Sequence, residues 1–309
     1  MDGIFNINKP TGMTSHDVVA KVRKLLKQKR VGHAGTLDPA ASGVLPVCVG
    51  QGTRVAEYLS ESGKEYRATV IFGVETDTYD VEGAITRTAS TEDLNLAGIE
   101  QELAGLRGPQ MQVPPRYSAI KIQGQAAYKR TRAGEELELE ARPIEISRLE
   151  IVAWQTPVLV LDVACSKGTY IRSLAYDLGR VSGCGAHLGG LIRTRSGPFS
   201  LDESITLEEL AHASEQGRLT GCLQPADKAL AHYPALHLST EETARVLHGN
   251  AFAWPDTQAE ATLARVYNAD GEFIAIAEWD AQESKWQPRK VLGPASRSEN
   301  SPNPSERRL

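Results

Sequence analysis

The stretch from Gly32 to Pro46 constrains this chain more than any other part of its 309 residues. It reads Gly-His-Ala-Gly-Thr-Leu-Asp-Pro-Ala-Ala-Ser-Gly-Val-Leu-Pro and holds a single carboxylate, Asp38. Gly32 and Gly35 allow tight turns and a close approach of a ligand to the backbone, and Pro39 restricts the chain directly after Asp38. A rigid loop with one carboxylate can support covalent or general-base chemistry. The simpler alternative is that Asp38 only caps a turn, which is the commoner role of aspartate before proline.

The net charge of −5 argues at first against a nucleic-acid partner, because proteins that bind phosphates usually carry a basic excess. The charges are unevenly spread, however. Residues 1–67 hold ten basic and six acidic side chains, residues 107–134 hold six basic and no acidic ones, and residues 69–105 hold eight acids against one arginine. A local basic surface can therefore coexist with a negative total. A single run of this kind is more often a solvated helix face.

Length and composition limit the class of protein. A chain of 309 residues predicts one large and one small domain, or two domains, and 41% hydrophobic residues can bury a sizeable core. No apolar run approaches the roughly 18 residues of a membrane span, and the N-terminus lacks a signal-peptide pattern, so we expect a cytoplasmic protein. The four cysteines form no C-x-x-C pair, which argues against a disulfide framework and a zinc site.

Apolar periodicity predicts strands interleaved with helices. We expect strands over 4–7, 44–49, 66–74, 143–154 and 158–164, and helices over 15–27, 53–60, 92–103, 169–180 and 207–215. Thr14 or Ser15 can cap the first of these helices, and Thr91 the third. Residues 225–234 resemble a domain boundary, after which short strands over 264–267 and 273–278 form a small module. The tail 293–309, rich in Ser, Pro, Asn and Arg, is predicted to be disordered.

The Gly32–Pro46 stretch resembles the active-site motif of the TruB family of pseudouridine synthases. Four further segments are similar to motifs of that family and follow in its order: Asn8–Ser15; Lys64–Arg67 with Phe72-Gly73 and Thr76–Thr78; Gln112–Lys121 with Gly124 and Ala127-Tyr128; and Cys165–Leu174 with Gly185–His187 and Leu191–Arg193. Five ordered motifs over about 200 residues are not a chance match. The chain is therefore identified as a member of this family.

The resemblance implies an α/β (α+β) pseudouridine-synthase fold, in which helices flank a central mixed, largely antiparallel sheet. It implies a catalytic domain over 1–230 with an RNA-contacting insertion at about 107–142, a PUA-like RNA-binding module over 231–292 and the disordered tail 293–309. The implied reaction is isomerisation of uridine 55 in the T-loop of tRNA to pseudouridine. Because nothing is oxidised or hydrolysed, we expect no cofactor and no metal; we also expect no membrane association and no obligate protein partner.

The resemblance also implies three catalytic side chains, Asp38, Tyr66 and Arg172. Asp38 is the nucleophile or base, Arg172 keeps its carboxylate charged and oriented, and Tyr66 stacks on the target base and helps proton transfer. Considered without the family, Arg172 is an ordinary helix-surface arginine and Tyr66 a tyrosine packed in a half-buried strand.

The implied substrate contacts are His33, Tyr170, Leu191 and Lys9. His33 inserts where the flipped base leaves the stack, Tyr170 and Leu191 line the uracil pocket, and Lys9 supports its wall. Core packing is the alternative for Leu191, and a turn position for His33. The basic block then becomes an adaptable loop that grips RNA phosphates. Its expected backbone contacts are Arg116, Lys121, Lys129, Arg130 and Arg132.

Two other functions compete with this interpretation. The first is modification of another RNA inside a guide-RNA particle, as in dyskerin-type relatives; the compact C-terminal module and the complete insertion favour a stand-alone tRNA enzyme. The second is an RNA-binding or RNA-folding module without catalysis. That alternative predicts loss of Asp38, Tyr66 or Arg172, and all three are present.

Overall fold

A ten-stranded sheet organises the larger part of the protein in a computed structural model, which describes residues 1–118, 120–122, 124–132, 135, 137, 139–254 and 262–293. The main path of the sheet runs β14-β1-β3-β12-β4-β11-β10-β7, with β2 paired to β3 and β13 to β12. The strands are β1 (Gly3–Lys9), β2 (Val31–His33), β3 (Ser42–Val49), β4 (Lys64–Phe72), β7 (Gly108–Gln112), β10 (Arg142–Gln155), β11 (Val158–Cys165), β12 (Ala186–Ser196), β13 (Phe199–Ser200) and β14 (Leu223–Gln224).

The sheet is mixed and largely antiparallel, as predicted. Among the strands that the structure describes, β3 and β12 form the parallel pair of this sheet, with Ile192 opposite Ser42 and Arg193 opposite Gly43. The other pairings, such as β4 with β11 and β12, are antiparallel. Because β3 follows the Asp38 loop directly, the β3–β12 pairing brings residues near 190 beside that loop.

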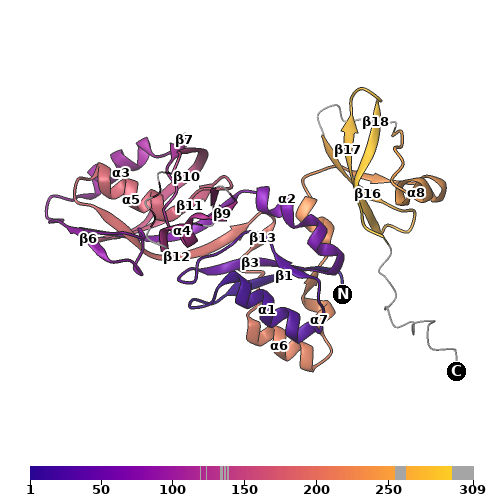
Figure 1. The fold of residues 1–309 in the computed structure, drawn as a ribbon, viewed down its shortest axis with the longest axis horizontal. Coiled ribbons are helices and arrows are strands. Elements are labelled where there is room, and N and C mark those ends of the chain that lie inside the picture. Colours follow the sequence, from indigo (N-terminus) through magenta and orange to yellow (C-terminus); the bar gives the residue numbers. More distant parts are fainter. Residues whose placement is uncertain are drawn as a thin grey trace.

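Helices cover the two halves of the sheet separately (Figure 1). Helices α1 (Ser15–Leu26) and α6 (Leu207–Glu215) pack on β1 and β3 through an apolar cluster that includes Val18, Val22 and Leu210. Helices α3 (Leu96–Gly105) and α5 (Ile171–Val181) pack on β4, β10 and β11 through a second cluster that includes Leu103 and Leu174. The site lies where these halves meet.

Local capping explains where the helices begin. Thr14 caps α1 as predicted: its Oγ1 accepts a hydrogen bond of 3.0 Å from the Asp17 backbone N–H. The prediction that Thr91 caps a helix over 92–103 was wrong. Helix α3 begins at Leu96 because Asn95 is the cap, its Oδ1 accepting from the Gly98 N–H at 3.0 Å, while residues 91–94 form a turn. Residues expected as one helix over 53–60 form the 3₁₀-helix η1 (Gly50–Val55) followed by α2 (Ala56–Glu61).

Smaller elements complete this part of the chain. A hairpin of β5 (Val74–Thr76) and β6 (Ile85–Thr88) follows β4, and the short helices α7 (Leu219–Cys222) and η2 (Ala226–Leu230) precede the C-terminal module. The predicted insertion contains the two-stranded β8 (Lys121–Ile122) and β9 (Gln125–Ala126) and the helix α4 (Ala127–Arg132).

The C-terminal module has its own four-stranded sheet, β15 (Ala235–His237), β16 (Leu263–Tyr267), β17 (Phe273–Asp280) and β18 (Lys285–Val291), with the helix α8 (Thr240–Leu247) (Figure 1). Val246 and Trp286 are buried in its separate core. Polar contacts join it to the larger part: Arg54 Nη1 donates to the Val291 carbonyl at 2.6 Å, and Lys290 Nζ lies 2.6 Å from Glu57 Oε1. The tail predicted to be disordered falls, beyond residue 293, outside the described residues.

Candidate active site

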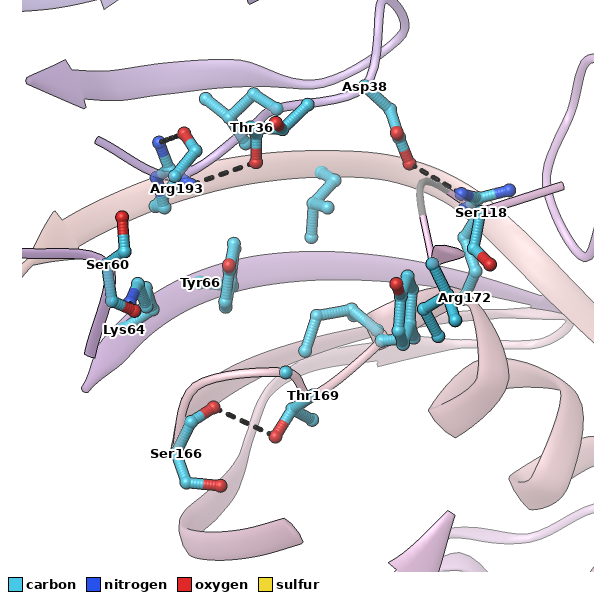
Figure 2. A pocket seen from close by; sticks show the side chains of 17 residues that line it. Thr36, Asp38, Ser60, Lys64, Tyr66, Ser118, Ser166, Thr169, Arg172 and Arg193 are labelled. Atoms are coloured by element: carbon cyan, nitrogen blue, oxygen red, sulfur yellow. Dashed lines mark hydrogen bonds and ion pairs between the residues drawn. The ribbon is translucent and has the colours of Figure 1, made fainter. Parts of the chain in front are cut away.

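A cavity of about 350 Å³ opens at the meeting point of β4, β12, the start of α5 and the Asp38 loop (Figure 2). Five of the residues predicted from the sequence line it, although they come from four separate segments of the chain: Asp38, Tyr66, Tyr170, Arg172 and Leu191. The fold therefore brings together all three predicted catalytic side chains and two of the four predicted substrate contacts.

An ion pair stands at one end of this cavity. Arg172 Nη2 lies 2.9 Å from Asp38 Oδ2, and the side chain of Arg172 is 8% exposed whereas that of Asp38 is 47% exposed. Arg172 also donates to the carbonyls of Tyr117 and Thr78 at 3.0 and 3.3 Å, and its Nη1 lies 3.5 Å from Asp80 Oδ2. The surface-arginine interpretation of Arg172 is therefore wrong, and the guanidinium holds the carboxylate in one orientation.

The loop that carries Asp38 is held by buried side chains from three elements. From β12, Arg193 donates to the carbonyls of Gly35, Thr36 and Val44 at 3.0, 3.2 and 2.7 Å. From α1, the Ser15 hydroxyl accepts from the Leu37 N–H at 2.8 Å. From β1, Lys9 Nζ donates to the Pro39 carbonyl at 3.4 Å. Gly35 adopts a φ of +89°, a conformation that favours glycine.

Arg193 is a residue that the sequence interpretation missed, since within its motif only Leu191 received a role. It is 1% exposed and lines the cavity. Strand periodicity could have identified Arg193 as a residue of the site, because side chains alternate along a strand and residues 191 and 193 therefore share a face of β12. Lys64 was missed for the same reason: it is two residues from Tyr66 on β4, and both line the cavity.

Tyr66 and Tyr170 contribute the two aromatic rings of the lining. Tyr66 is the third residue of β4 and lies opposite Val163 on one side and Arg193 on the other. Burial raises the pKa of Tyr66 and that of Tyr170 above the ordinary phenol value, so both hydroxyls keep their protons near neutral pH. Gln112 holds Tyr170 in place, because its side-chain amide exchanges two hydrogen bonds of 2.8 and 3.0 Å with the Tyr170 backbone.

His33 and Lys9 do not line this cavity. His33 lies on β2, its Nδ1 is buried without a hydrogen-bond partner, and its ring meets that of His16 edge to face at 5.2 Å between centroids. Burial and the neighbouring His16 lower the pKa of His33, so the ring is neutral at pH 7. Lys9 is fully buried and donates to backbone carbonyls, including Met13 O at 2.7 Å. Its contact with the Asp38 loop is a support for the cavity wall.

The predicted RNA-backbone contacts are only partly described. Arg116 is exposed, and Arg130 pairs with Glu135 at 2.6 Å. The side chains of Lys121, Lys129 and Arg132 lie outside the described part of the structure, although their backbones belong to β8 and α4. The insertion is tied to the site, because the Tyr117 carbonyl accepts from Arg172 and the Thr131 hydroxyl donates to the Arg116 carbonyl at 3.1 Å.

The cavity offers one carboxylate beside a buried guanidinium, with two phenol rings in the same lining, and this arrangement can support nucleophilic or general-base chemistry on a planar ligand. The lining offers one carboxylate, Asp38, whereas hydrolytic glycosidases work with a pair of carboxyl groups.

Among the described residues, no group of three or more His, Cys, Asp or Glu is placed to hold a metal ion. Within the same residues, no helix has the length and apolar character needed to cross a membrane.

Solved structures resemble the whole chain and not only the site. A crystal structure of a Cbf5-Nop10-Gar1 complex contains a chain with a TM-score of 0.74 and 30% identity, covering 94% of this chain and 84% of that one. A structure of an H/ACA RNP bound to a substrate RNA containing 2'-deoxyuridine gives a TM-score of 0.73 at 29% identity, covering 94% and 85%. Nearly the whole chain therefore shares the fold of the chains in these two structures.

Family models define the class of this protein, which is that of the pseudouridylate synthases. Residues 23–171 match the N-terminal domain of the TruB family of pseudouridylate synthases, residues 172–231 the C-terminal domain of tRNA pseudouridylate synthase B, and residues 234–292 the C-terminal part of pseudouridine synthase II TruB. The chain belongs to the TruB family.

Proteins called tRNA pseudouridine synthase B are similar to this chain over nearly their whole length. The one from Dehalococcoides mccartyi is 44% identical over 292 residues, which cover 94% of this chain and 97% of the relative. The one from Geobacter sulfurreducens is 46% identical, covering 90% and 93%. The one from Pseudomonas aeruginosa is 42% identical, covering 94% and 96%. The similarity therefore includes both the catalytic region and the C-terminal module.

Proposed function

We propose that this protein isomerises uridine 55 in the T-loop of tRNA to pseudouridine. The observation that carries the proposal is the 2.9 Å ion pair between Asp38 and the buried Arg172 at the edge of a cavity of about 350 Å³. An arginine in this position favours the ionised carboxylate, which is the form that a nucleophile or base needs. The names of the relatives provide the substrate, tRNA.

The proposed reaction proceeds in steps, each of which uses particular residues of the cavity. The target nucleotide leaves the stack and its base lies against Tyr66, Tyr170 and Leu191. Asp38 then attacks the ribose at C1′, attacks the base, or takes a proton from the ribose, and the C1′–N1 bond breaks with its electron pair staying on the base. After the base turns, C5 bonds to C1′; in the same stage any bond from Asp38 to the substrate breaks, or the proton that Asp38 took returns to the ribose. The proton on C5 is lost and N1 gains one, so the product is an isomer of the substrate.

The proposal also assigns roles to the domains and to the segments outside the cavity. Residues 1–230 form the catalytic domain, the insertion at about 107–142 grips phosphates, and residues 231–292 act as a PUA-like RNA-binding module. His33 occupies the gap that the flipped base leaves, for which a neutral ring is suited. We expect the protein to work in the cytoplasm without an obligate protein partner, metal or cofactor.

The test is tritium release from a tRNA transcript whose uridines carry tritium at C5, because the isomerisation must lose that hydrogen. The purified protein alone should release one equivalent per tRNA, and a matched transcript with cytidine at position 55 should release none. Asp38→Asn should lower the single-turnover rate by about 10⁴-fold or more, as loss of a catalytic side chain commonly does. Release that requires a guide RNA or added proteins would instead support the guide-RNA alternative.

A further inference from the structure

Two buried cations, Lys64 and Arg193, lie at the end of the cavity away from Arg172 (Figure 2). Lys64 is 7% exposed and Arg193 is 1% exposed. Both border the same point of the Asp38 loop: a Cβ atom placed on Gly35 would lie 3.6 Å from Arg193 Nη1 and 3.9 Å from Lys64 Cε. Tyr66 lies between this pair and Arg172, so the two cations border the surface on which the base is proposed to stack.

Neither cation has an acidic partner among the residues that the structure describes. Lys64 Nζ donates only to backbone carbonyls, those of Leu59, Ser60 and Ser62, and the guanidinium of Arg193 donates to those of Gly35, Thr36 and Val44. The lining of the cavity therefore holds three cations and one carboxylate, and that carboxylate is already paired with Arg172. Burial of unpaired charge is costly, so the excess positive charge calls for an explanation.

Backbone support alone explains the hydrogen bonds but not the charge. Lys64 holds carbonyls at the end of α2, and Arg193 holds the Asp38 loop, yet neutral donors could serve both purposes without a desolvated charge beside a cavity. A uridine base is neutral in the ground state. When the C1′–N1 bond breaks and the electron pair stays on the base, the uracil ring becomes an anion at this point.

We propose that Lys64 and Arg193 stabilise the negative charge that develops on the uracil ring as the C1′–N1 bond breaks. This inference rests on the proposed function and adds two charge-stabilising residues to it. The three ammonium protons of Lys64 are committed to carbonyls, so it acts through its field. Arg193 donates three of its five N–H groups to carbonyls and places its charge beside Tyr66. Fixed charges in a site that excludes water stabilise developing charge without reorganisation.

The proposal has a consequence for pH, because Lys64 can lose its charge in an accessible range. Burial, with a contribution from Arg193 on β12, lowers the pKa of Lys64 to about 8. The other titratable group that faces it is Cys165 on β11, where burial raises the pKa of the thiol to about 11, so this group stays neutral. Most Lys64 side chains are therefore charged at pH 7, and most are neutral at pH 9.

The experiment measures the single-turnover rate of tritium release between pH 6 and 10 for the wild type, Lys64→Arg and Lys64→Met. The wild-type rate should fall above pH about 8, and Lys64→Arg should remove this fall because arginine keeps its charge. Lys64→Met should lower the rate at pH 7 by roughly 10- to 100-fold with unchanged tRNA affinity. Lys21→Met, at an exposed position of α1 that does not line the cavity, is the matched control and should behave as the wild type.

Three outcomes would overturn the proposal. In the first, the same alkaline fall persists in Lys64→Arg, as it would if ionisation of the uridine itself caused it. In the second, the fall disappears in Lys9→Arg and not in Lys64→Arg; burial lowers the pKa of Lys9 to about 8 as well, but Lys9 does not line the cavity. In the third, Lys64→Met weakens tRNA binding and leaves the rate unchanged, which would indicate a phosphate contact.

A folding defect and a failure of the proposed function can each be distinguished from a failure of the role proposed for Lys64. If Lys64→Met does not fold, as judged by its thermal unfolding curve, the pH profiles of the wild type and Lys64→Arg still decide the proposal. If the wild type releases no tritium from tRNA, the proposed function fails first. If the wild type is active and only the Lys64 predictions fail, the function stands and the charge-stabilising role does not.

Discussion

The guanidinium of Arg193 donates from Nη2 to the carbonyl oxygen of Gly35 at 3.0 Å, across 158 positions of sequence. With its bonds to Thr36 and Val44, it joins β12 to both ends of the loop that carries Asp38. The position of the carboxylate therefore depends on a strand that follows it far along the chain. Small displacements of a reacting group lower rates strongly, so this support is functionally testable.

Arg193→Lys tests the loop support directly. A lysine keeps the positive charge but lacks the planar fork that reaches three carbonyls at once, so the Asp38 loop should lose its fixed position. We expect the single-turnover rate of tritium release to fall by about 100-fold, with tRNA affinity within about twofold of the wild type. A rate equal to that of the wild type in a folded Arg193→Lys protein would contradict the role of these bonds.

Tyr66→Phe separates stacking from proton transfer. The substitution keeps the ring against the base and removes only the hydroxyl, whose pKa is raised by burial. We expect tRNA affinity to stay unchanged and the single-turnover rate to fall by about 100-fold, which is the usual contribution of a general acid or base. Tyr66→Leu, which also removes the ring, should in addition weaken binding of the RNA. An unchanged rate in Tyr66→Phe would show that the phenol has no part in the chemistry.

The insertion should dominate the salt dependence of tRNA binding. The triple variant Lys129→Glu, Arg130→Glu and Arg132→Glu removes up to three phosphate contacts, so the slope of log K against log salt concentration should become shallower by about two to three. Lys21→Glu, at an exposed position of α1 outside both the insertion and the C-terminal module, serves as the control for a change in net charge. Equal slopes for the triple variant and the wild type would rule out the assignment of this segment to the phosphates.

The raised pKa of the Asp177 carboxyl predicts that the stability of the protein depends on pH. Burial raises the pKa of this carboxyl from 3.8 to about 6, so the folded protein binds the proton more tightly than the unfolded chain. The contribution to stability is fully present below pH about 4 and is lost as the pH rises through 6. Asp177→Asn should therefore raise the free energy of unfolding by about 1 kcal/mol at pH 7.5 and leave it nearly unchanged at pH 4.

Asp162 provides the matched control with the opposite sign. A hydrogen bond from Arg67 lowers the pKa of Asp162, so its contribution is present above the unfolded pKa and is lost in acid. Asp162→Asn should destabilise the protein slightly at pH 7.5 and less at lower pH, because this pair is exposed. Urea unfolding at the two pH values measures both variants. A loss of stability at pH 7.5 in Asp177→Asn would contradict the direction given for that carboxyl.

Local patterns along the chain were enough to predict most helices and strands, whereas the candidate residues near the cavity came from the resemblance to family motifs. The strand around Tyr66 and the helix at 207–215 could be predicted because apolar periodicity reports which face is buried. The start of α3 could not, because Thr91 and Asn95 are both good caps and the choice depends on how the helix packs. The resemblance to a family motif identified Asp38 as a catalytic candidate, whereas the spacing of the residues around it favoured a turn-capping role.

The sequence by itself determined the strand and helix periods, the rigid loop around Asp38 and the motifs that predict the chemistry. Only the tertiary structure decided that Arg172 is a buried partner of Asp38, that Arg193 holds the loop and that Lys64 lies unpaired beside the cavity among the described residues. The physical reason is that hydrophobic periodicity is a local property. The burial and the pairing of a charge instead depend on elements that meet only after the β3–β12 pairing forms.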